Sequence, residues 1–168
     1  MSRKKPVDQM SLKIESRSVN ESFARVAVSA FAAQQDPTVE EISDIKTAVS
    51  EAVTNCIVHA YGKKGEAEEQ TNENRILIEC EIEDTPGGED SGGVLHIGIT
   101  DYGCGIEDVE QAMQPFYTTL SDDERSGMGF TIMQTFMTDF SVTSEKGKGT
   151  TVRMSKKSVS YTHLRAHE

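Results

Sequence analysis

The chain has 168 residues, a length typical of one compact domain. Hydrophobic residues make up 36% and charged residues 27%, a composition that excludes fibrous and fully disordered proteins. The formal net charge of -11 opposes binding to nucleic acid or to an anionic membrane. No apolar run reaches the roughly 20 residues of a membrane helix, and the basic first residues precede no apolar signal segment. We therefore expect a cytoplasmic protein with a protein partner.

The first half of the chain predicts a short strand and two helices. Residues 1–10 are polar and expected to be disordered, whereas Leu12–Glu15 alternates as a half-buried strand does. A helix is expected to begin near Asn20 and to end before Asp36-Pro37. Its apolar stripe contains Phe23, Val26, Ala27, Ala30 and Phe31. Thr38 is expected to cap a second helix that ends near Gly62. The apolar side of that helix contains Ile42, Ile45, Val49, Ala52, Val53 and Cys56.

The middle of the chain predicts two strands followed by a short helix. Ile76–Ile82 follows a polar loop and has the composition of a strand, and Val94–Thr100 alternates apolar and polar residues. Between them, the glycine-rich residues 84–93 predict a long turn. A short acidic helix is expected at Glu107–Met113.

The last third predicts a helix beginning at Gly129 and a hairpin of Phe140–Ser144 with Thr151–Ser155. Because the expected strands come in adjacent pairs, the order favours an α+β sandwich with an antiparallel or mixed sheet over a doubly wound parallel one. We expect one domain over residues 11–156. Residues 157–168 continue no element and are expected to be a non-native or disordered tail.

Two groups of polar residues suggest one half of a ligand site. Glu51 and Asn55 are four residues apart on the polar side of the second helix, where they either address one ligand together or form an ordinary solvated surface. Asp101-x-Gly103-x-Gly105 directly follows a strand. The glycines allow close approach to a flat ligand, and the carboxylate accepts a hydrogen bond from an amine such as that of adenine. A simple turn is the alternative.

Two further groups suggest the other half. Gly127-Met128-Gly129 precedes and opens a helix and follows Arg125-Ser126. A glycine-rich helix N-terminus binds phosphate through backbone N–H groups, and an arginine beside it binds a phosphate in bidentate fashion, although a flexible hinge has the same composition. Thr150 follows Gly149, where its hydroxyl either supports the base site or reflects strand propensity.

The four groups together resemble, in order and spacing, the N, G1 and G2 boxes of the Bergerat ATP-binding fold. That resemblance implies a two-layer α/β sandwich of the histidine-kinase-like ATPase type, with helices on one face of the sheet. Within this superfamily, four segments resemble the anti-sigma-F factors of endospore-forming bacteria, which are serine kinases of sporulation. The segments are residues 20–26, 36–38, 45–55 and 124–133, and the resemblance spans about residues 10–156.

The resemblance implies a homodimer that binds the sporulation sigma factor F, holds it inactive, and uses ATP to phosphorylate a serine of an anti-anti-sigma antagonist. Glu51 would be the base for the serine hydroxyl, and Asn55 would bind both ATP and Mg²⁺. Arg25 matches a family position at the partner surface. His59 continues the side of Glu51 and Asn55, and we expect it to pack or to support a neighbouring site residue rather than to act as a catalyst.

The remaining ATP contacts are also implied by the resemblance. Asp101 would accept the adenine amine, with Gly103 and Gly105 giving the base room and Thr150 assisting. Residues 114–126 would form a lid over the triphosphate, in which Arg125 meets the γ-phosphate. The phosphate-binding group is expected to contain Ser126, Gly127, Met128 and Gly129.

Three alternatives remain open. A stress-response anti-sigma serine kinase has the same fold and boxes. An ATPase fragment of a sensor histidine kinase also has these boxes, but no dimerisation helix with a phospho-acceptor histidine precedes Glu51. The third alternative is a non-catalytic binding module whose partner affinity depends on nucleotide.

Overall fold

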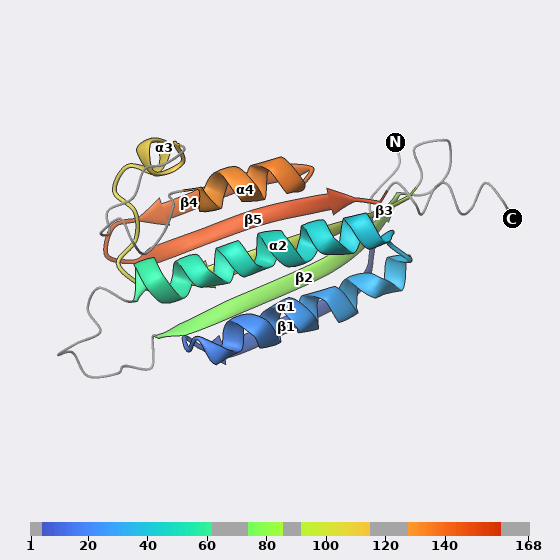
Figure 1. The fold of residues 1–168 in the computed structure, drawn as a ribbon, viewed down its shortest axis with the longest axis horizontal. Coiled ribbons are helices and arrows are strands. Elements are labelled where there is room, and N and C mark those ends of the chain that lie inside the picture. The colour runs from blue at the N-terminus through green and yellow to red at the C-terminus, as the bar shows by residue number, and fades with distance from the viewer. Residues whose placement is uncertain (1–4, 62–73, 86–91, 115–127, 159–168) are drawn as a thin grey trace, which may run out of the picture.

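The computed structural model describes residues 5–61, 74–85, 92–114 and 128–158, which form a two-layer α+β sandwich. Its antiparallel sheet has the order β1-β2-β3-β5-β4, and α1, α2 and α4 lie on the same face of it (Figure 1). The strands are β1 (Lys5–Glu15), β2 (Arg75–Thr85), β3 (Gly92–Asp101), β4 (Asp139–Glu145) and β5 (Gly149–Lys157). The helices are α1 (Val19–Ala32), α2 (Val39–Asn55), α3 (Val109–Ala112) and α4 (Gly129–Phe136), with a 3₁₀ turn η1 (Ala33–Gln35) and a π-helical turn η2 (Cys56–Ala60). The predicted fold class is confirmed, with a sheet that is antiparallel throughout these residues.

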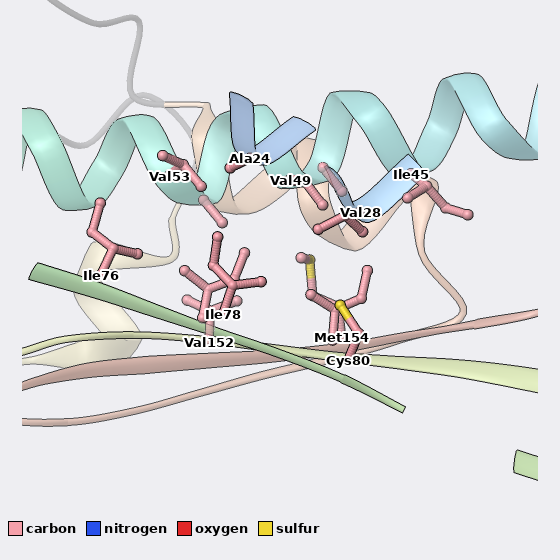
Figure 2. Close-up of a cluster of buried hydrophobic side chains, with 14 of the residues drawn as sticks. Ala24, Val28, Ile45, Val49, Val53, Ile76, Ile78, Cys80, Val152 and Met154 are labelled. Carbon is pink, nitrogen blue, oxygen red and sulfur yellow. The ribbon is translucent and has the colours of Figure 1, made fainter. Parts of the chain in front are cut away.

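The core lies between the sheet and the helices. In β2 and β3, every second side chain faces the helices and is buried, because successive side chains of a strand point to opposite faces. From α2, Ile45, Val49 and Val53 meet this layer at the four-residue spacing expected of one helix face (Figure 2). Burying each of these aliphatic side chains stabilises the fold by about 1.5–3 kcal/mol. The apolar side predicted for α2 is thus largely confirmed, with Ile42 only partly buried.

The apolar stripe predicted for α1 was wrong at Phe23, Val26 and Ala30 and right at Phe31, which is buried. Phe23 and Val26 are 50% and 59% exposed, and Ala30 is also exposed. The buried side contains Ala24, Val28, Phe31 and Ala32. Because α1 is apolar around most of its circumference, spacing alone could not select the face, and small side chains such as Ala24 allow it to pack closely on α2. The helix also begins at Val19, and the Asn20 side chain donates to Glu15 O (2.9 Å) instead of capping.

Both ends of the described chain are more ordered than the sequence suggests. β1 begins at Lys5, so residues 5–10, which were expected to be disordered, pair with β2 from Lys5 opposite Asp84 onward. Their polar composition fits an edge strand with one face turned away from the helices. The final strand includes Lys157, and Ser158 N donates to Gly93 O (3.0 Å), so the predicted tail begins too early. Residues 159–168 lie outside the described part of the chain.

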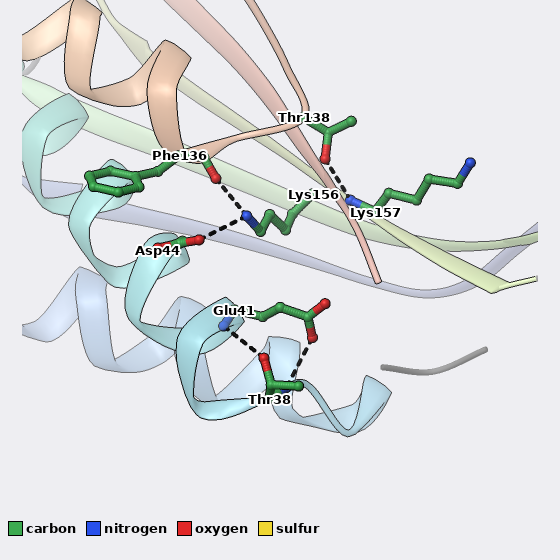
Figure 3. Close-up of polar contacts among 7 residues, drawn as sticks. All are labelled: Thr38, Glu41, Asp44, Phe136, Thr138, Lys156 and Lys157. Carbon is green, nitrogen blue, oxygen red and sulfur yellow. Dashed lines mark hydrogen bonds and ion pairs between the residues drawn. The ribbon is translucent and has the colours of Figure 1, made fainter. Parts of the chain in front are cut away.

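Two polar clusters fix the ends of the helices (Figure 3). Thr38 caps α2 as predicted: its Oγ1 accepts from Glu41 N (3.0 Å), while Glu41 Oε1 accepts from Thr38 N (2.9 Å). Lys156 Nζ on β5 contacts Asp44 Oδ2 (3.0 Å) on α2 and donates to Phe136 O (2.6 Å) at the end of α4. Lys156 therefore holds both helices against one strand. None of the described helices is long and apolar enough to cross a membrane.

We expect Lys156→Met to lower the free energy of unfolding by about 1–3 kcal/mol, because it leaves the partly buried Asp44 carboxylate and the Phe136 carbonyl without their donor. Urea denaturation monitored by circular dichroism measures the change. Lys157→Met is the matched control, since the side chain of Lys157 is exposed. Equal losses in the two variants would show that the ammonium contacts contribute nothing.

Candidate functional site

Asp101, the last residue of β3, is a buried carboxylate that is 5% exposed. Its Oδ1 accepts from Gly103 N (3.0 Å), and the Cys56 thiol and the Thr150 backbone N–H also donate to the carboxylate. Burial raises the pKa of Asp101, and these three donors offset part of that effect. A buried carboxylate held by neutral donors is a strong acceptor, which suits it to bind a donor such as an exocyclic amine.

The backbone after Asp101 is held against the end of α2. Tyr102 N donates to Tyr61 Oη (2.7 Å), and Tyr61 Oη donates in turn to Arg75 O (2.7 Å) at the start of β2. Cys104 N donates to Ala60 O (3.2 Å) in η2. Tyr61 was not predicted from the sequence, because a tyrosine near a helix end is ordinary and its partners are backbone groups of distant segments.

Gly103 and Gly105 are required by close packing of the chain on itself. A Cβ on Gly103 would overlap Ala60 O, and one on Gly105 would overlap Glu145 O at the end of β4. Gly105 also has a φ of 76°, a left-handed conformation that favours glycine. Close contacts with protein backbone therefore explain why glycine is required at both positions. That the two glycines also make space for a nucleotide base stays a prediction.

Glu51, Asn55 and Gly129 are brought together where α2 and α4 approach. A Cβ on Gly129 would lie 3.3 Å from Glu51 Oε1 and 3.2 Å from Asn55 Nδ2, so these side chains lie against the first residue of α4. Met128 flanks that helix at its N-terminus. Backbone N–H groups in the first turn of a helix have no intrahelical acceptor and attract anions. A carboxylate, an amide oxygen and a helix N-terminus thus meet at one point.

A row of polar side chains crosses the ends of three strands. Asp101 on β3 stands opposite Thr150 on β5, which stands opposite Ser144 on β4. Thr150 Oγ1 and Ser144 Oγ are 2.7 Å apart. Asp101 and Thr150 were predicted from the sequence, whereas Ser144 was not. The available signal was the alternation of β4, which places Ser144 on the same side as Phe140 and Val142, both packed on the core.

Other predicted residues lie elsewhere or outside the described chain. Arg25 is on α1, where its Nε lies 3.6 Å from Glu21 Oε2. His59 is in η2, and its carbonyl accepts from Cys104 Sγ (3.5 Å). Arg125, Ser126 and Gly127 fall outside the described residues, as does the predicted lid except for Gln114.

A separate hollow lies on the face of the sheet that carries no helices. Its lining includes Gln9, Glu81, His96, Gly98 and Arg153. None of the predicted site residues lines it, since those described on the strands point to the helix side. The candidate site is therefore the region around Asp101, Thr150, Glu51, Asn55 and Gly129.

Comparison with known proteins agrees with this geometry. Residues 14–156 match the family model described as the histidine kinase-like ATPase domain. The chain is 55% identical over 149 residues to the anti-sigma F factor of Caldanaerobacter subterraneus subsp. tengcongensis, covering 89% of this chain and 93% of that protein. The anti-sigma F factors of Clostridium botulinum (strain Eklund 17B / Type B) and Clostridium acetobutylicum are 55% and 50% identical, with 89% of this chain and 94% of each relative covered.

Among solved structures, the fold is similar to the RsbU and RsbW domains of Rv1364c from Mycobacterium tuberculosis, with a TM-score of 0.59 and 16% identity. The match covers 91% of this chain and 33% of that one, so this chain spans about a third of its length. At this identity the likeness supports the fold alone. The sequence matches extend over nearly the whole chain and include the residues that meet at the candidate site. The chain belongs to the histidine kinase-like ATPase domain family and, within it, to the anti-sigma F factors.

Proposed function

We propose that the protein binds and inhibits the sporulation sigma factor F and, as an ATP-dependent serine kinase, phosphorylates the anti-anti-sigma antagonist of that complex. The observation that carries the kinase proposal is the meeting of Glu51 and Asn55 with Gly129 at the start of α4. The sigma factor partner is supported by 55% identity to a protein named anti-sigma F factor, and the antagonist is proposed from the resemblance of the motifs.

The residues at the strand ends fit the adenine of ATP. Asp101 is a buried acceptor that supplies the hydrogen bond an adenine amine requires, and Thr150 stands beside it on β5. The packing of Gly103 and Gly105 on η2 and the β4–β5 turn holds this end of the site in place before a ligand arrives.

The residues at the start of α4 fit the phosphates and a magnesium ion. Asn55 would hold Mg²⁺ through its side-chain oxygen, and one such ligand suffices because Mg²⁺ keeps several waters. When bound, the ion neutralises charge on the phosphates. The backbone around Met128 and Gly129 would bind phosphate at the helix N-terminus. Arg125, Ser126 and Gly127 are proposed to complete this group.

Glu51 would act on the attacking serine. Its carboxylate lies against Gly129, next to the proposed phosphate position, and so could accept the serine proton as the serine oxygen attacks the γ-phosphorus. The bond from the γ-phosphorus to the bridging oxygen breaks, and ADP leaves with the electron pair. The protein mainly positions these groups.

The sigma factor surface is proposed to include α1. Arg25 is partly exposed there, and the neighbouring Phe23 and Val26 are exposed apolar side chains on a helix whose other side is buried. Exposed apolar residues beside a charged one are typical of a protein contact. The net charge of -11 favours a partner with a basic surface. We further propose that the functional unit is a homodimer.

The first test concerns Glu51→Gln, which we expect to keep ATP affinity within about threefold and to slow transfer by about 100-fold or more, because only the proton acceptor is lost. The protein is incubated with Mg-ATP and the antagonist from the same organism, and phosphoserine is measured by intact mass. Glu40→Gln, an exposed carboxylate on the same helix, is the control. Unchanged transfer would remove Glu51 as the base. Wild-type protein that binds ATP without any transfer would favour the non-catalytic binding module.

The second test concerns Asp101→Asn, which we expect to weaken ATP binding by about 10-fold to 100-fold, the value of a hydrogen bond to a charged group. Burial raises the pKa of Asp101, so at pH values above that pKa the buried charge lowers the free energy of unfolding. A neutral amide removes this cost but places an NH2 group against donors that the carboxylate accepts from, so the free energy of unfolding at pH 7 should fall by about 1–3 kcal/mol. Calorimetry with ATP and urea denaturation measure the two quantities. Unchanged ATP affinity would overturn the adenine assignment.

A further inference from the structure

Ser144 makes three hydrogen-bond contacts at the inner edge of the candidate site. Its Oγ accepts from Ile106 N (2.7 Å), lies 3.0 Å from Gly149 O, and lies 2.7 Å from Thr150 Oγ1. These contacts join the loop after Asp101 to both strands of the β4–β5 hairpin. Neither the sequence motifs nor the proposed kinase mechanism assigns any role to this residue.

The number of hydroxyl protons at Ser144 decides the direction of these bonds. A serine hydroxyl has one proton and two lone pairs. Since a carbonyl oxygen only accepts, the contact with Gly149 O is attractive only when Ser144 donates its proton there. The two lone pairs then accept from Ile106 N and from the Thr150 hydroxyl. In the opposite assignment Ser144 donates to Thr150, and two acceptors, Ser144 Oγ and Gly149 O, would then face each other at 3.0 Å.

The same assignment fixes the chemistry of Thr150. Its only hydroxyl proton is used in the bond to Ser144, so Thr150 Oγ1 presents lone pairs to any other neighbour. Thr150 stands directly opposite Asp101 across the β3–β5 pair, and its backbone N–H donates to the Asp101 carboxylate. Asp101 and Thr150 therefore form a pair of side-chain acceptors at this end of the site.

We propose that Ser144 is a positioning residue that holds the Thr150 hydroxyl as an acceptor and so makes the site prefer a 6-aminopurine over a 6-oxopurine. The inference rests on the proposed binding of adenine at Asp101. The amine of adenine donates to acceptors, whereas the 6-oxo group of hypoxanthine or guanine is itself an acceptor and is repelled by them.

The test compares the dissociation constants of ATP and inosine triphosphate, whose base carries a 6-oxo group. In Ser144→Ala the Thr150 proton is released and can rotate to donate to the 6-oxo oxygen. We expect the ratio of the inosine triphosphate to the ATP dissociation constant to fall by about threefold to tenfold, the range of one hydrogen bond. A general loosening of the loop through Ile106 would weaken both nucleotides and leave this ratio unchanged. Isothermal calorimetry on the full chain measures both constants.

Two further variants separate this role from a structural one. Ser141→Ala removes the same group from an exposed position on β4 and should leave the ratio unchanged. In a Thr150→Val background, Ser144→Ala should no longer change the ratio, because Ser144 acts through the Thr150 hydroxyl. Should Ser144→Ala fail to fold, the ratio is measured in Ser144→Cys, whose thiol is a weak hydrogen-bonding group.

The outcomes distinguish this inference from the proposed function. If the wild-type protein prefers ATP and the ratio is the same in the Ser144 variants, the role of Ser144 is wrong while adenine binding at Asp101 stands. If the wild-type protein binds neither nucleotide, the proposed function itself fails.

Discussion

The candidate site depends on one constraint, the direct contact of three backbone segments around the end of β3. Gly103 packs against Ala60 O, Gly105 against Glu145 O, and Gly149 against Asp101 O, and a Cβ at any of the three would overlap the neighbouring oxygen. These segments come from the end of η2, the loop after β3 and the β4–β5 turn. Because they are far apart in sequence, they meet only when the sheet and the helix layer have both formed. The position of Asp101 is thus a product of the whole fold.

The helix layer places the other half of the site by a different rule. One side of α2 supplies Val49 and Val53 to the core, and the four-residue period places Glu51 and Asn55 together on another side. The start of α4 must then approach α2 closely, which Gly129 permits because any side chain there would press on both polar groups. At the other end of α4, Lys156 ties Phe136 O to Asp44 on α2. The two ends of α4 are therefore fixed by different contacts with the same helix.

Sequence patterns predicted most of the fold because they reflect local physics. Strand-like composition located β2, alternation located β3, a strand-turn-strand pattern located the hairpin, and apolar spacing with a capping threonine located α2. The buried face of α1 was predicted wrongly because it does not depend on local sequence. The helix has two apolar sides, and packing against α2 determines which one is buried. The early start of β1 was missed because an edge strand can be polar, and pairing with β2 was not visible in its composition.

The candidate site was predicted unevenly for a related reason. Glu51, Asn55, Asp101 and Gly129 belong to motifs with fixed spacing, so a single sequence was enough to predict them as candidate site residues. Tyr61 and Ser144 act through backbone groups such as Arg75 O and Ile106 N, which impose no side-chain type on their partners. Nothing in a linear pattern marks such a residue, and only the folded chain brings the donor to its acceptor.

If the protein has the proposed function, the two halves of the site bind different parts of one nucleotide. The base end is built from strand ends, backbone hydrogen bonds and glycine contacts, which leave few conformations to select among. It would therefore bind the same base in ATP and ADP with equal strength. Any difference in affinity between the two must then arise where α2 meets α4, at Glu51, Asn55 and Gly129. The change from ATP to ADP would alter contacts at the helices and leave the sheet unchanged. Coupling between the bound nucleotide and partner binding would therefore pass through the helix layer, in which α1 packs against α2.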